Sequence, residues 1–287
     1  MSFRDLLKEK LEEKNLKLDA DLNKLPKGYQ KIGDIIVLNL DEVFNDYKKE
    51  IGEATLEIFP KVRSICNKYG EIKGKFREPQ IELLVGDENT IVTHIEHGCK
   101  YRFDIRKLMF AKGNLSERVR IPKQVRDGEI IVDMFAGLGY FSIPIGKLSN
   151  PGKLYSIELN PVSYKFLKEN FEINKIKNAE AINGDNREII NGLVDEGVKA
   201  DRVLMGYLPP PKEFLPWAFK IIKKNGILHY EDLVVKGKED EEYERIMNDV
   251  RRAGKEEGFE NFELILPKKI KSYGPKIEHY VFDIKVS

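Results

Sequence analysis

Hydrophobic and polar positions follow two different patterns along the chain of 287 residues. In the N-terminal part, short apolar runs separated by glycine and acidic residues predict strands over residues 32–40, 81–84, 91–97 and 100–104. Apolar positions at helical spacing after Asp41 predict a helix over residues 42–68, interrupted by Pro60. This part of the chain is therefore expected to form an α+β domain.

From residue 129 onward, strands alternate with helices. Apolar runs predict strands over residues 129–133, 153–158, 179–183, 201–205, 226–230 and 280–285. Helical spacing is found over residues 139–148, 161–174, 186–192, 214–224 and 240–254. Such alternation is typical of α/β folds, in which helices cover both faces of a parallel sheet. We expect two domains, residues 1–121 and residues 122–287, with a polar linker over residues 122–128.

Composition narrows the class of protein without identifying it. Hydrophobic residues make up 41% of the chain and charged residues 34%, with a net charge of +1, as in globular proteins. Two cysteines and four histidines lack metal-ligand or disulfide spacing, so no metal is expected. An apolar run long enough for a membrane span or a signal core is also missing. We expect a cytoplasmic protein with no membrane partner.

The stretch most informative about function covers residues 130–139, Ile-Ile-Val-Asp-Met-Phe-Ala-Gly-Leu-Gly. A buried strand runs here into a glycine turn that opens a helix, and glycine lets a backbone approach a ligand closely. A glycine turn alone is weak evidence, because it also occurs without a ligand. We predict that Asp133, Phe135 and Gly137 form one wall of a cofactor site.

Acidic residues after the next two strands strengthen this prediction. Glu158 ends the second strand and can accept hydrogen bonds from two ribose hydroxyls. Asp185 and Asn186 follow the third strand, where a carboxylate and an amide can recognise adenine. Asp133 would repel a pyrophosphate but suits a ligand that carries an ammonium and a sulfonium, or else it supports the loop. The pattern favours S-adenosylmethionine over NAD.

The loop after the fourth strand is expected to face the acceptor. Its sequence over residues 205–211, Met-Gly-Tyr-Leu-Pro-Pro-Pro, is stiffened by proline. Tyr207 is a candidate catalytic-site residue that stacks on an extruded base. The alternative is a structural proline turn in which Tyr207 is only packed.

Residues 132–139 resemble the cofactor loop of archaeal and eukaryotic tRNA enzymes that act on guanosine 37, either N1-methyltransferases or wybutosine-pathway aminocarboxypropyltransferases. Similar segments lie at residues 97–104, 117–121, 226–230 and 270–275, followed by His279 and Asp283. The resemblance extends from about residue 33 to the end. It implies a class I S-adenosylmethionine-dependent methyltransferase-like Rossmann fold, a smaller N-terminal α+β domain associated with tRNA, and S-adenosylmethionine as cofactor.

The resemblance also separates two branches. Methylating members usually carry an asparagine after the fourth strand, and Gly206 falls at that position here. The chain thus resembles the tRNA wybutosine-synthesizing protein 2 branch. This branch implies transfer of the 3-amino-3-carboxypropyl group to 4-demethylwyosine at position 37 of tRNA-Phe. The alternatives are N1-methylation of guanosine 37, methylation of the tricyclic intermediate, or a non-catalytic tRNA-binding or cofactor-sensing module.

Arg118 is the second candidate catalytic residue. In the resembling enzymes the arginine of this Glu-Arg-Val-Arg segment contacts the cofactor, and a guanidinium can hold the carboxylate of the amino-acid chain. The alternatives are a surface arginine or a phosphate contact. A serine common in the family seven residues earlier is replaced by Ala111. His229 and Tyr230 are weaker candidates, because a buried histidine is more often a satisfied core residue.

Basic residues near the C-terminus are candidates for contact with the tRNA backbone. They surround Tyr273, and Arg106, Lys107 and Lys112 near the domain junction extend the predicted surface. The cluster consists of Lys268, Lys269, Lys271 and Lys276. The alternative is an ordinary solvated face.

Overall fold

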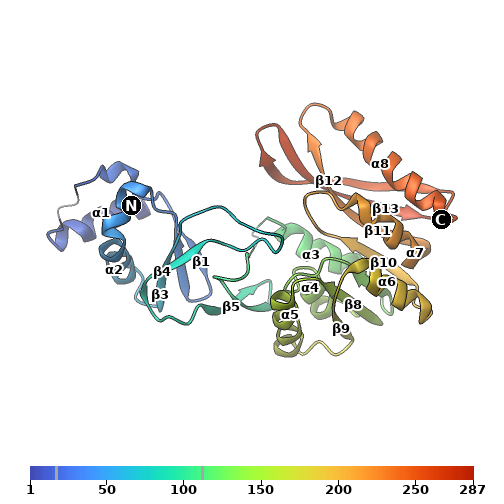
Figure 1. Cartoon of the computed structure of the whole chain (residues 1–287), viewed down its shortest axis with the longest axis horizontal. Coiled ribbons are helices and arrows are strands. Elements are labelled where there is room, and N and C mark those ends of the chain that lie inside the picture. Colours follow the sequence, from blue (N-terminus) through green and yellow to red (C-terminus); the bar gives the residue numbers. More distant parts are fainter. Residues whose placement is uncertain (17–18, 111–112) are drawn as a thin grey trace. The chain divides into compact units, whose positions relative to one another are not determined.

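The computed structural model describes residues 1–16, 19–110 and 113–287, and the chain divides into two compact units, Met1–Phe110 and Ala111–Ser287 (Figure 1). The boundary expected after residue 121 falls inside helix α3 (Leu115–Gln124), which belongs to the second unit. The expected linker likewise begins within this helix, at Pro122. A polar helix end that is followed by glycine has the composition of a linker, which explains the difference.

In residues 1–16 and 19–110, the first unit combines two α-helices, a four-stranded sheet and a separate ribbon. The sheet has the order β1-β2-β3-β4, with β2 and β3 parallel and the other pairs antiparallel. Its helices pack Leu7, Leu11 and Ile51 into one apolar core with Ile65 of the sheet. The elements are α1 (Phe3–Glu13), β1 (Gln30–Ile32), β2 (Ile35–Leu38), α2 (Lys48–Ile58), β3 (Ser64–Lys68), β4 (Ile81–Gly86) and the antiparallel ribbon β5 (Ile91–Glu96) with β6 (Cys99–Asp104).

The helix predicted over residues 42–68 is wrong in its last part. Asp41 caps the start as expected, because its carboxylate accepts a hydrogen bond of 3.1 Å from the Val43 N–H. A 3-10 turn (Glu42–Tyr47) then leads into α2, which ends at Ile58. The following segment is β3, a central strand with four successive buried residues. Such a strand has no polar alternation, so periodicity cannot distinguish it from a helix.

The second unit contains a seven-stranded sheet in the order β12-β13-β11-β10-β7-β8-β9. The five strands from β11 to β9 are mutually parallel, and β13 is antiparallel to both of its neighbours. The strands are β7 (Ile130–Asp133), β8 (Lys153–Glu158), β9 (Ala179–Asn183), β10 (Ala200–Met205), β11 (Ile222–Val235), β12 (Phe262–Gly274) and β13 (Ile277–Val286). The helices other than α3 are α4 (Ser142–Leu148), α5 (Pro161–Asn174), α6 (Asn186–Asp195), α7 (Leu215–Ile221) and α8 (Glu239–Glu256).

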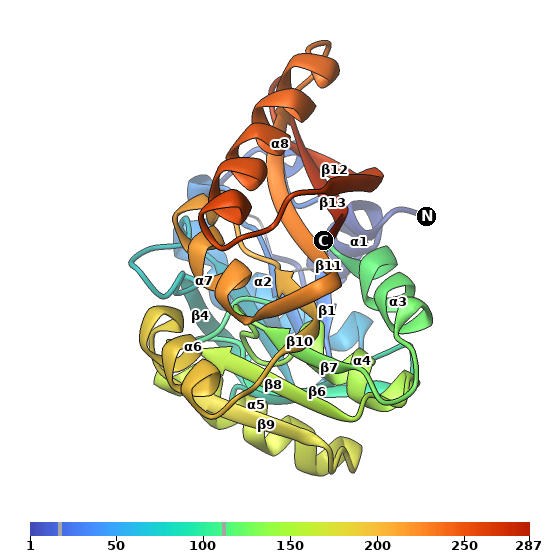
Figure 2. The same ribbon diagram turned by 90° about the vertical axis from the view of Figure 1, so that its right-hand side faces the viewer.

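Helices cover this sheet on both sides, as the alternation predicts. Helices α3, α4 and α5 lie together over one face, and α6, α7 and α8 lie over the other (Figure 2). The chain leaves β7 toward β8 and β9 on one side, and then returns to place β10 on the other side of β7. In open α/β sheets, ligands bind at the carboxyl ends of the strands beside such a reversal. The fold therefore places a candidate site beyond β7 and β10.

Two strands differ from the prediction near the C-terminus. Strand β11 continues well past residue 230, and β12 was not predicted. Strand β10 ends at Met205, which is paired with Tyr230, so residues 231–235 of β11 extend beyond β10 and pair with β13. This extension places Glu231 next to the loop that follows β10.

Candidate active site

Asp133 lies at the base of the glycine loop and is fully buried. Its carboxylate accepts hydrogen bonds from Ser142 Oγ at 2.6 Å and from the Phe135 N–H at 3.3 Å, and Ser156 Oγ in turn donates to Ser142 Oγ. Burial raises the pKa of Asp133 to about 6, and the negative charge of Glu231 adds to this effect. Both oxygens have protein donors, which agrees with a role in supporting the loop.

Glu158 connects the second strand to the same loop. The Gly137 N–H donates to Oε2 and the Asn160 N–H donates to Oε1, each at 2.7 Å. Burial of the carboxylate raises its pKa to about 7. Gly137 has a φ of +58°, and a Cβ there would lie 2.8 Å from the Tyr140 ring. The loop thus requires glycine, and the Glu158 carboxylate retains lone pairs for further donors such as ribose hydroxyls.

Asp185 and Asn186 begin helix α6 after β9. Asp185 caps the helix through the Arg187 N–H and forms an ion pair of 2.6 Å with the Arg187 side chain. Asn186 is buried and donates from Nδ2 to the Met134 carbonyl at 2.5 Å. Within the described part of the chain, its Oδ1 atom has no hydrogen-bond partner. A buried amide oxygen needs a donor, and the amino group of an adenine ring is one.

Arg118 lies on α3 beside the glycine loop. Its side chain is 2% exposed, and its guanidinium carbon lies 5.0 Å from the centre of the Tyr140 ring. It is therefore not a surface arginine. Together with the orphaned oxygen of Asn186, the Glu158 carboxylate and the glycine turn, this arrangement fits an adenosine-containing cofactor with a charged amino-acid chain.

Aromatic rings gather where β7 and β10 end. Tyr207 stacks on Phe135 with ring centres 5.2 Å apart, and Phe135 meets Phe214 edge-on at 5.2 Å. Arg187 lies over the Phe214 ring at 5.6 Å. One face of Tyr207 is thus occupied by Phe135, and its stacking on a substrate base remains a prediction.

Gly206 precedes Tyr207 and lies in a crowded position. A Cβ there would lie 2.6 Å from Phe141 Cε2 and 3.7 Å from Glu231 Oε1. Residue 206 therefore cannot carry a side chain unless Phe141 moves. Glu231 was missed by the sequence analysis, although it follows a predicted strand directly, as Asp185 nearly does. The rule that an acid at a strand end marks the site would have selected it.

His229 belongs to a buried network rather than to the cofactor loops. Its Nε2 atom lies 2.6 Å from Arg202 Nη1, and its Nδ1 atom lies 2.5 Å from Asp283 Oδ1. Because an arginine only donates, Nε2 must accept and Nδ1 carries the proton that it donates to Asp283. Burial lowers the pKa of His229, in agreement with a neutral ring. Tyr230 faces the apolar core.

In the basic cluster near the C-terminus, two lysines form ion pairs and two are exposed. Lys268 forms an ion pair of 2.7 Å with the buried Glu117, and Lys269 pairs with Glu278. Lys271 is exposed and its side chain lies against Gly113. Lys276, which has a φ of +60°, is exposed in the β12–β13 turn. Lys112 and Ala111 lie outside the described residues.

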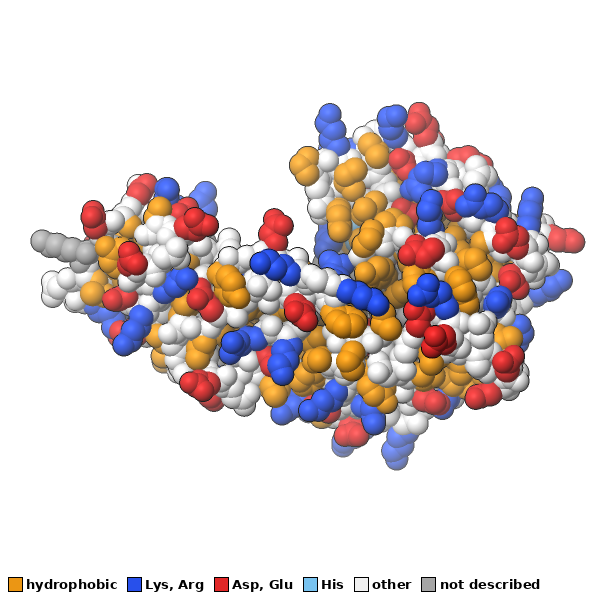
Figure 3. Space-filling model, viewed as in Figure 1, with side chains coloured by type: hydrophobic (Ala, Val, Ile, Leu, Met, Phe, Trp, Pro, Cys, Tyr) orange, Lys and Arg blue, Asp and Glu red, His pale blue; other side chains and the backbone are white. Residues whose placement is uncertain are grey.

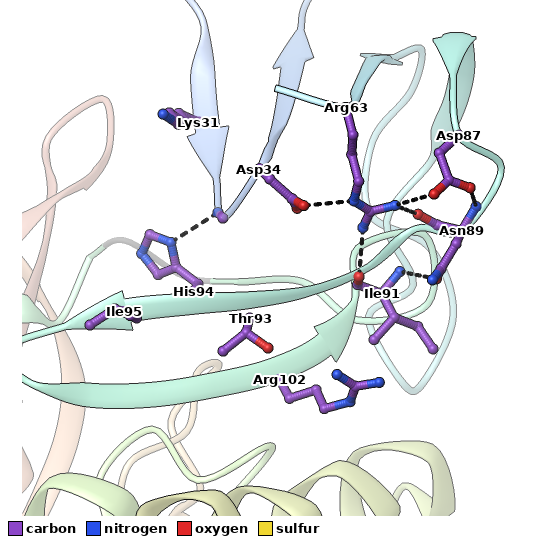
Figure 4. A pocket seen from close by; sticks show the side chains of 11 residues that line it. Lys31, Asp34, Arg63, Asp87, Asn89, Ile91, Thr93, His94, Ile95 and Arg102 are labelled. Carbon is purple, nitrogen blue, oxygen red and sulfur yellow. Dashed lines mark hydrogen bonds and ion pairs between the residues drawn. The ribbon is translucent and has the colours of Figure 1, made fainter. Parts of the chain in front are cut away.

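A separate pocket of about 720 Å³ is lined only by residues of the first unit (Figure 4). Arg63 donates from Nε to Asp34 Oδ2 at 2.8 Å and from Nη2 to the Ile91 carbonyl at 2.6 Å. Its charge is thus committed to protein acceptors. Lys31 and Arg102 line the same pocket, which shares no residue with the cofactor loops.

Two further expectations concern metal ligands and membrane-spanning helices. In residues 1–16, 19–110 and 113–287, no three His, Cys, Asp or Glu side chains are grouped as metal ligands. Among the helices described there, none has the length and apolar character needed to cross a membrane.

Comparison with known proteins gives a consistent result. The TYW2 N-terminal domain matches residues 3–90, and the TRM5/TYW2 methyltransferase domain matches residues 92–262. A tRNA(Phe) (4-demethylwyosine(37)-C(7)) aminocarboxypropyltransferase of Pyrococcus horikoshii is 38% identical over 99% of this chain and 96% of that protein. A tRNA (guanine(37)-N(1))-methyltransferase of Pyrococcus abyssi is 32% identical over 92% of this chain and 76% of that protein.

Among solved structures, P. horikoshii TYW2 in complex with MeSAdo matches with a TM-score of 0.80 and 34% identity, over 99% of both chains. This likeness confirms the predicted Rossmann fold of the methyltransferase class, with its smaller N-terminal domain. The predicted cofactor, S-adenosylmethionine, agrees with the ligands named for solved relatives. By sequence and by structure, the chain belongs to the TRM5/TYW2 family.

Proposed function

We propose that this protein transfers the 3-amino-3-carboxypropyl group of S-adenosylmethionine to 4-demethylwyosine at position 37 of tRNA-Phe. The observation that carries the proposal is the grouping of polar side chains at the carboxyl ends of β7, β8, β9 and β10. There Glu158, Asn186 and Arg118 surround one glycine loop, and Gly206 leaves the adjoining position without a side chain. The naming of the P. horikoshii relative supports the same reaction. We expect the enzyme to act in the cytoplasm, where its tRNA is.

Each residue group has a distinct role in the proposed reaction. When bound, S-adenosylmethionine supplies a sulfonium with three electrophilic carbons. Glu158 and Asn186 hold the nucleoside, and Arg118 holds the carboxylate of the amino-acid chain. Tyr207 limits the position of the acceptor base. Selectivity among the three carbons then depends on which one is held in line with the acceptor carbon.

The bond changes require no redox partner. A carbon–carbon bond forms between the acceptor ring and the aminocarboxypropyl chain while the carbon–sulfur bond of that chain breaks. Methylthioadenosine leaves as a neutral thioether, and the acceptor ring loses one proton to water. Alignment by the chain's own residues is the main contribution of the protein.

RNA contact is assigned to two basic regions. Lys271 and Lys276 are exposed near the C-terminus, and Lys31 with Arg102 lines the pocket of the first unit. On the face shown in Figure 3, basic and acidic side chains are interspersed over both units. On that face, contact with the anticodon loop would depend on particular side chains rather than on a uniform basic patch.

The deciding experiment is a transfer assay. The protein is incubated with S-adenosylmethionine and tRNA-Phe that carries 4-demethylwyosine, and the digested nucleosides are weighed. A mass gain of one aminocarboxypropyl group, with release of methylthioadenosine, is expected. A gain of one methyl group with S-adenosylhomocysteine would move the protein to the methylating branch, and an unmodified nucleoside would leave a binding module.

A further inference from the structure

Glu231 is a buried carboxylate at the edge of the candidate site. It is 4% exposed and lies on the part of β11 that extends beyond β10. Its Oε1 atom lies 3.7 Å from the position that a Cβ of Gly206 would take, and that position borders Phe141 at the end of the glycine loop. Glu231 therefore lies where the loops after β7 and β10 meet.

A neutral amide orients the Glu231 carboxylate, and no lysine or arginine forms an ion pair with it in the part of the chain that the structure describes. Asn114, the N-cap residue of α3, makes no cap hydrogen bond with its side chain and donates from Nδ2 to Glu231 Oε1 at 3.1 Å. His279 Nε2 lies 3.1 Å from Oε2, but not in a hydrogen-bonding direction. Among the described residues, neither ring nitrogen of the buried His279 has a hydrogen-bond partner.

A buried carboxylate has about four acceptor positions and is costly to bury unless cations or donors meet it. Asp133 lies close enough that the charge of Glu231 acts on it. The two carboxylates thus give this end of the site a negative potential that favours a cationic ligand. Residue 206 adds no side chain beside Glu231 Oε1, and the ring of Phe141 borders that position.

We infer that Glu231, oriented by Asn114, binds the ammonium group of the donor's amino-acid chain. Arg118 then holds the carboxylate of that chain, so the chain is fixed at both of its charged ends. This inference rests on the proposed function, because it takes S-adenosylmethionine as the donor. It makes Glu231 a donor-binding residue that helps to determine which carbon faces the acceptor.

The test compares two ligands by calorimetry in the absence of tRNA. S-adenosylmethionine carries the ammonium and a sulfonium, whereas methylthioadenosine has the same nucleoside with a neutral thioether and no amino-acid chain. Glu231→Gln should weaken S-adenosylmethionine binding about 10-fold or more, the usual effect of losing a charged hydrogen bond. Methylthioadenosine affinity should stay within about 2-fold, and this unchanged affinity also shows that the variant is folded. Glu256→Gln on α8, which is exposed, is the charge-matched control and should leave both affinities unchanged.

A second variant checks the geometry. Asn114→Ala keeps the carboxylate but removes its orienting donor, so it should produce a smaller loss with the same ligand dependence. Equal losses for both ligands in Glu231→Gln would overturn the inference. An unchanged S-adenosylmethionine affinity with a raised KM for tRNA would also overturn it, because Glu231 would then face the acceptor. If the wild type transfers methyl groups, the proposed function fails, while this binding comparison still tests Glu231.

Discussion

The second unit contains two groups of buried charged residues that differ in how they are compensated. Beneath α3, Asp283 meets the guanidinium of Arg120 as well as His229, and Arg202 meets Glu129 at 3.0 Å. At the carboxyl edge, Asp133 and Glu158 meet hydroxyl and backbone N–H donors. The network beneath α3 pairs charges of opposite sign, whereas the edge surrounds carboxylates with neutral dipoles.

The pKa values of the carboxylates in these two groups differ from their ordinary values in opposite directions. Burial opposes ionisation of Asp283, but the hydrogen bond from His229 and the charge of Arg120 outweigh it and hold its pKa well below the usual range. Burial is not outweighed at the edge, so the pKa rises to about 6 for Asp133 and about 7 for Glu158. We interpret the first group as scaffold and the second as a site completed by a cationic ligand.

The largest effect is expected from Asp283→Asn, which removes one of the two buried carboxylates that pair with Arg120, the other being Glu117, and also the partner of His229. Breaking a buried ion pair from one side typically costs about 3–5 kcal/mol. Unfolding in urea should be followed by fluorescence of Trp217, the single tryptophan, which packs on the core of the second unit. The exposed control Glu256→Gln should change stability little, and a loss below about 1 kcal/mol for Asp283→Asn would contradict the scaffold role.

A smaller effect on stability but a clear one on binding is expected from Glu158→Gln. The variant loses the charged acceptor for the ribose hydroxyls, worth about 1.5–3 kcal/mol, for both S-adenosylmethionine and methylthioadenosine. This ligand dependence differs from that of Glu231→Gln, in which the affinity for methylthioadenosine is retained. Calorimetry with both ligands separates the two carboxylates.

The pH dependence of the same variant sharpens this test. Glu158 has a folded pKa of about 7, above its ordinary 4.5, so its contribution to stability is present below pH 4.5 and lost as pH rises through 7. Because hydroxyls donate to the ionised form, ligand affinity of the wild type should rise with pH through 7, with release of a proton on binding. Glu158→Gln should remove that release, and a release that persists would assign it to another group.

The smallest effect is expected from the exposed lysines. Replacing Lys271 and Lys276 by alanine should weaken binding of the proposed tRNA and reduce the slope of log affinity against log salt by at most about 2. Binding titrations at several salt concentrations measure both quantities. Lys165 and Lys255, exposed on α5 and α8, form the matched control pair. An unchanged slope would exclude the C-terminal lysines from the RNA contact.

The alternation of strands and helices in the second unit could be predicted because each element is short and has a clear period. Strand β8, strand β9 and helix α5 have the bounds expected from sequence. Strand β12 could not be recognised, because Pro267 and its lysines hide an edge strand that gains its order by pairing with β13.

Some residues of the candidate site could likewise be predicted from the sequence, and others could not. Glu158 ends one predicted strand and Asn186 follows the next, so the topology of the sheet brings them together. The network around His229 depends on Arg202 and Asp283, which lie 27 and 54 residues away in the chain, and no local pattern reveals such partners. Glu231 directly follows the strand predicted over residues 226–230, so the rule of an acid at a strand end could have found it, although β11 itself continues to Val235.

Strand β12 is the outermost strand of the seven-stranded sheet, with β13 as its neighbour. An open edge of this kind can recruit a strand from another molecule and begin aggregation. Pro267 interrupts its hydrogen-bonding groups, three register shifts bend it, and lysines at 268, 269 and 271 give it positive charge. Exchanging these lysines for apolar residues would therefore affect more than RNA contact. It would leave an uncharged strand edge beside Ile265, half of whose surface is already accessible, and such an edge favours self-association.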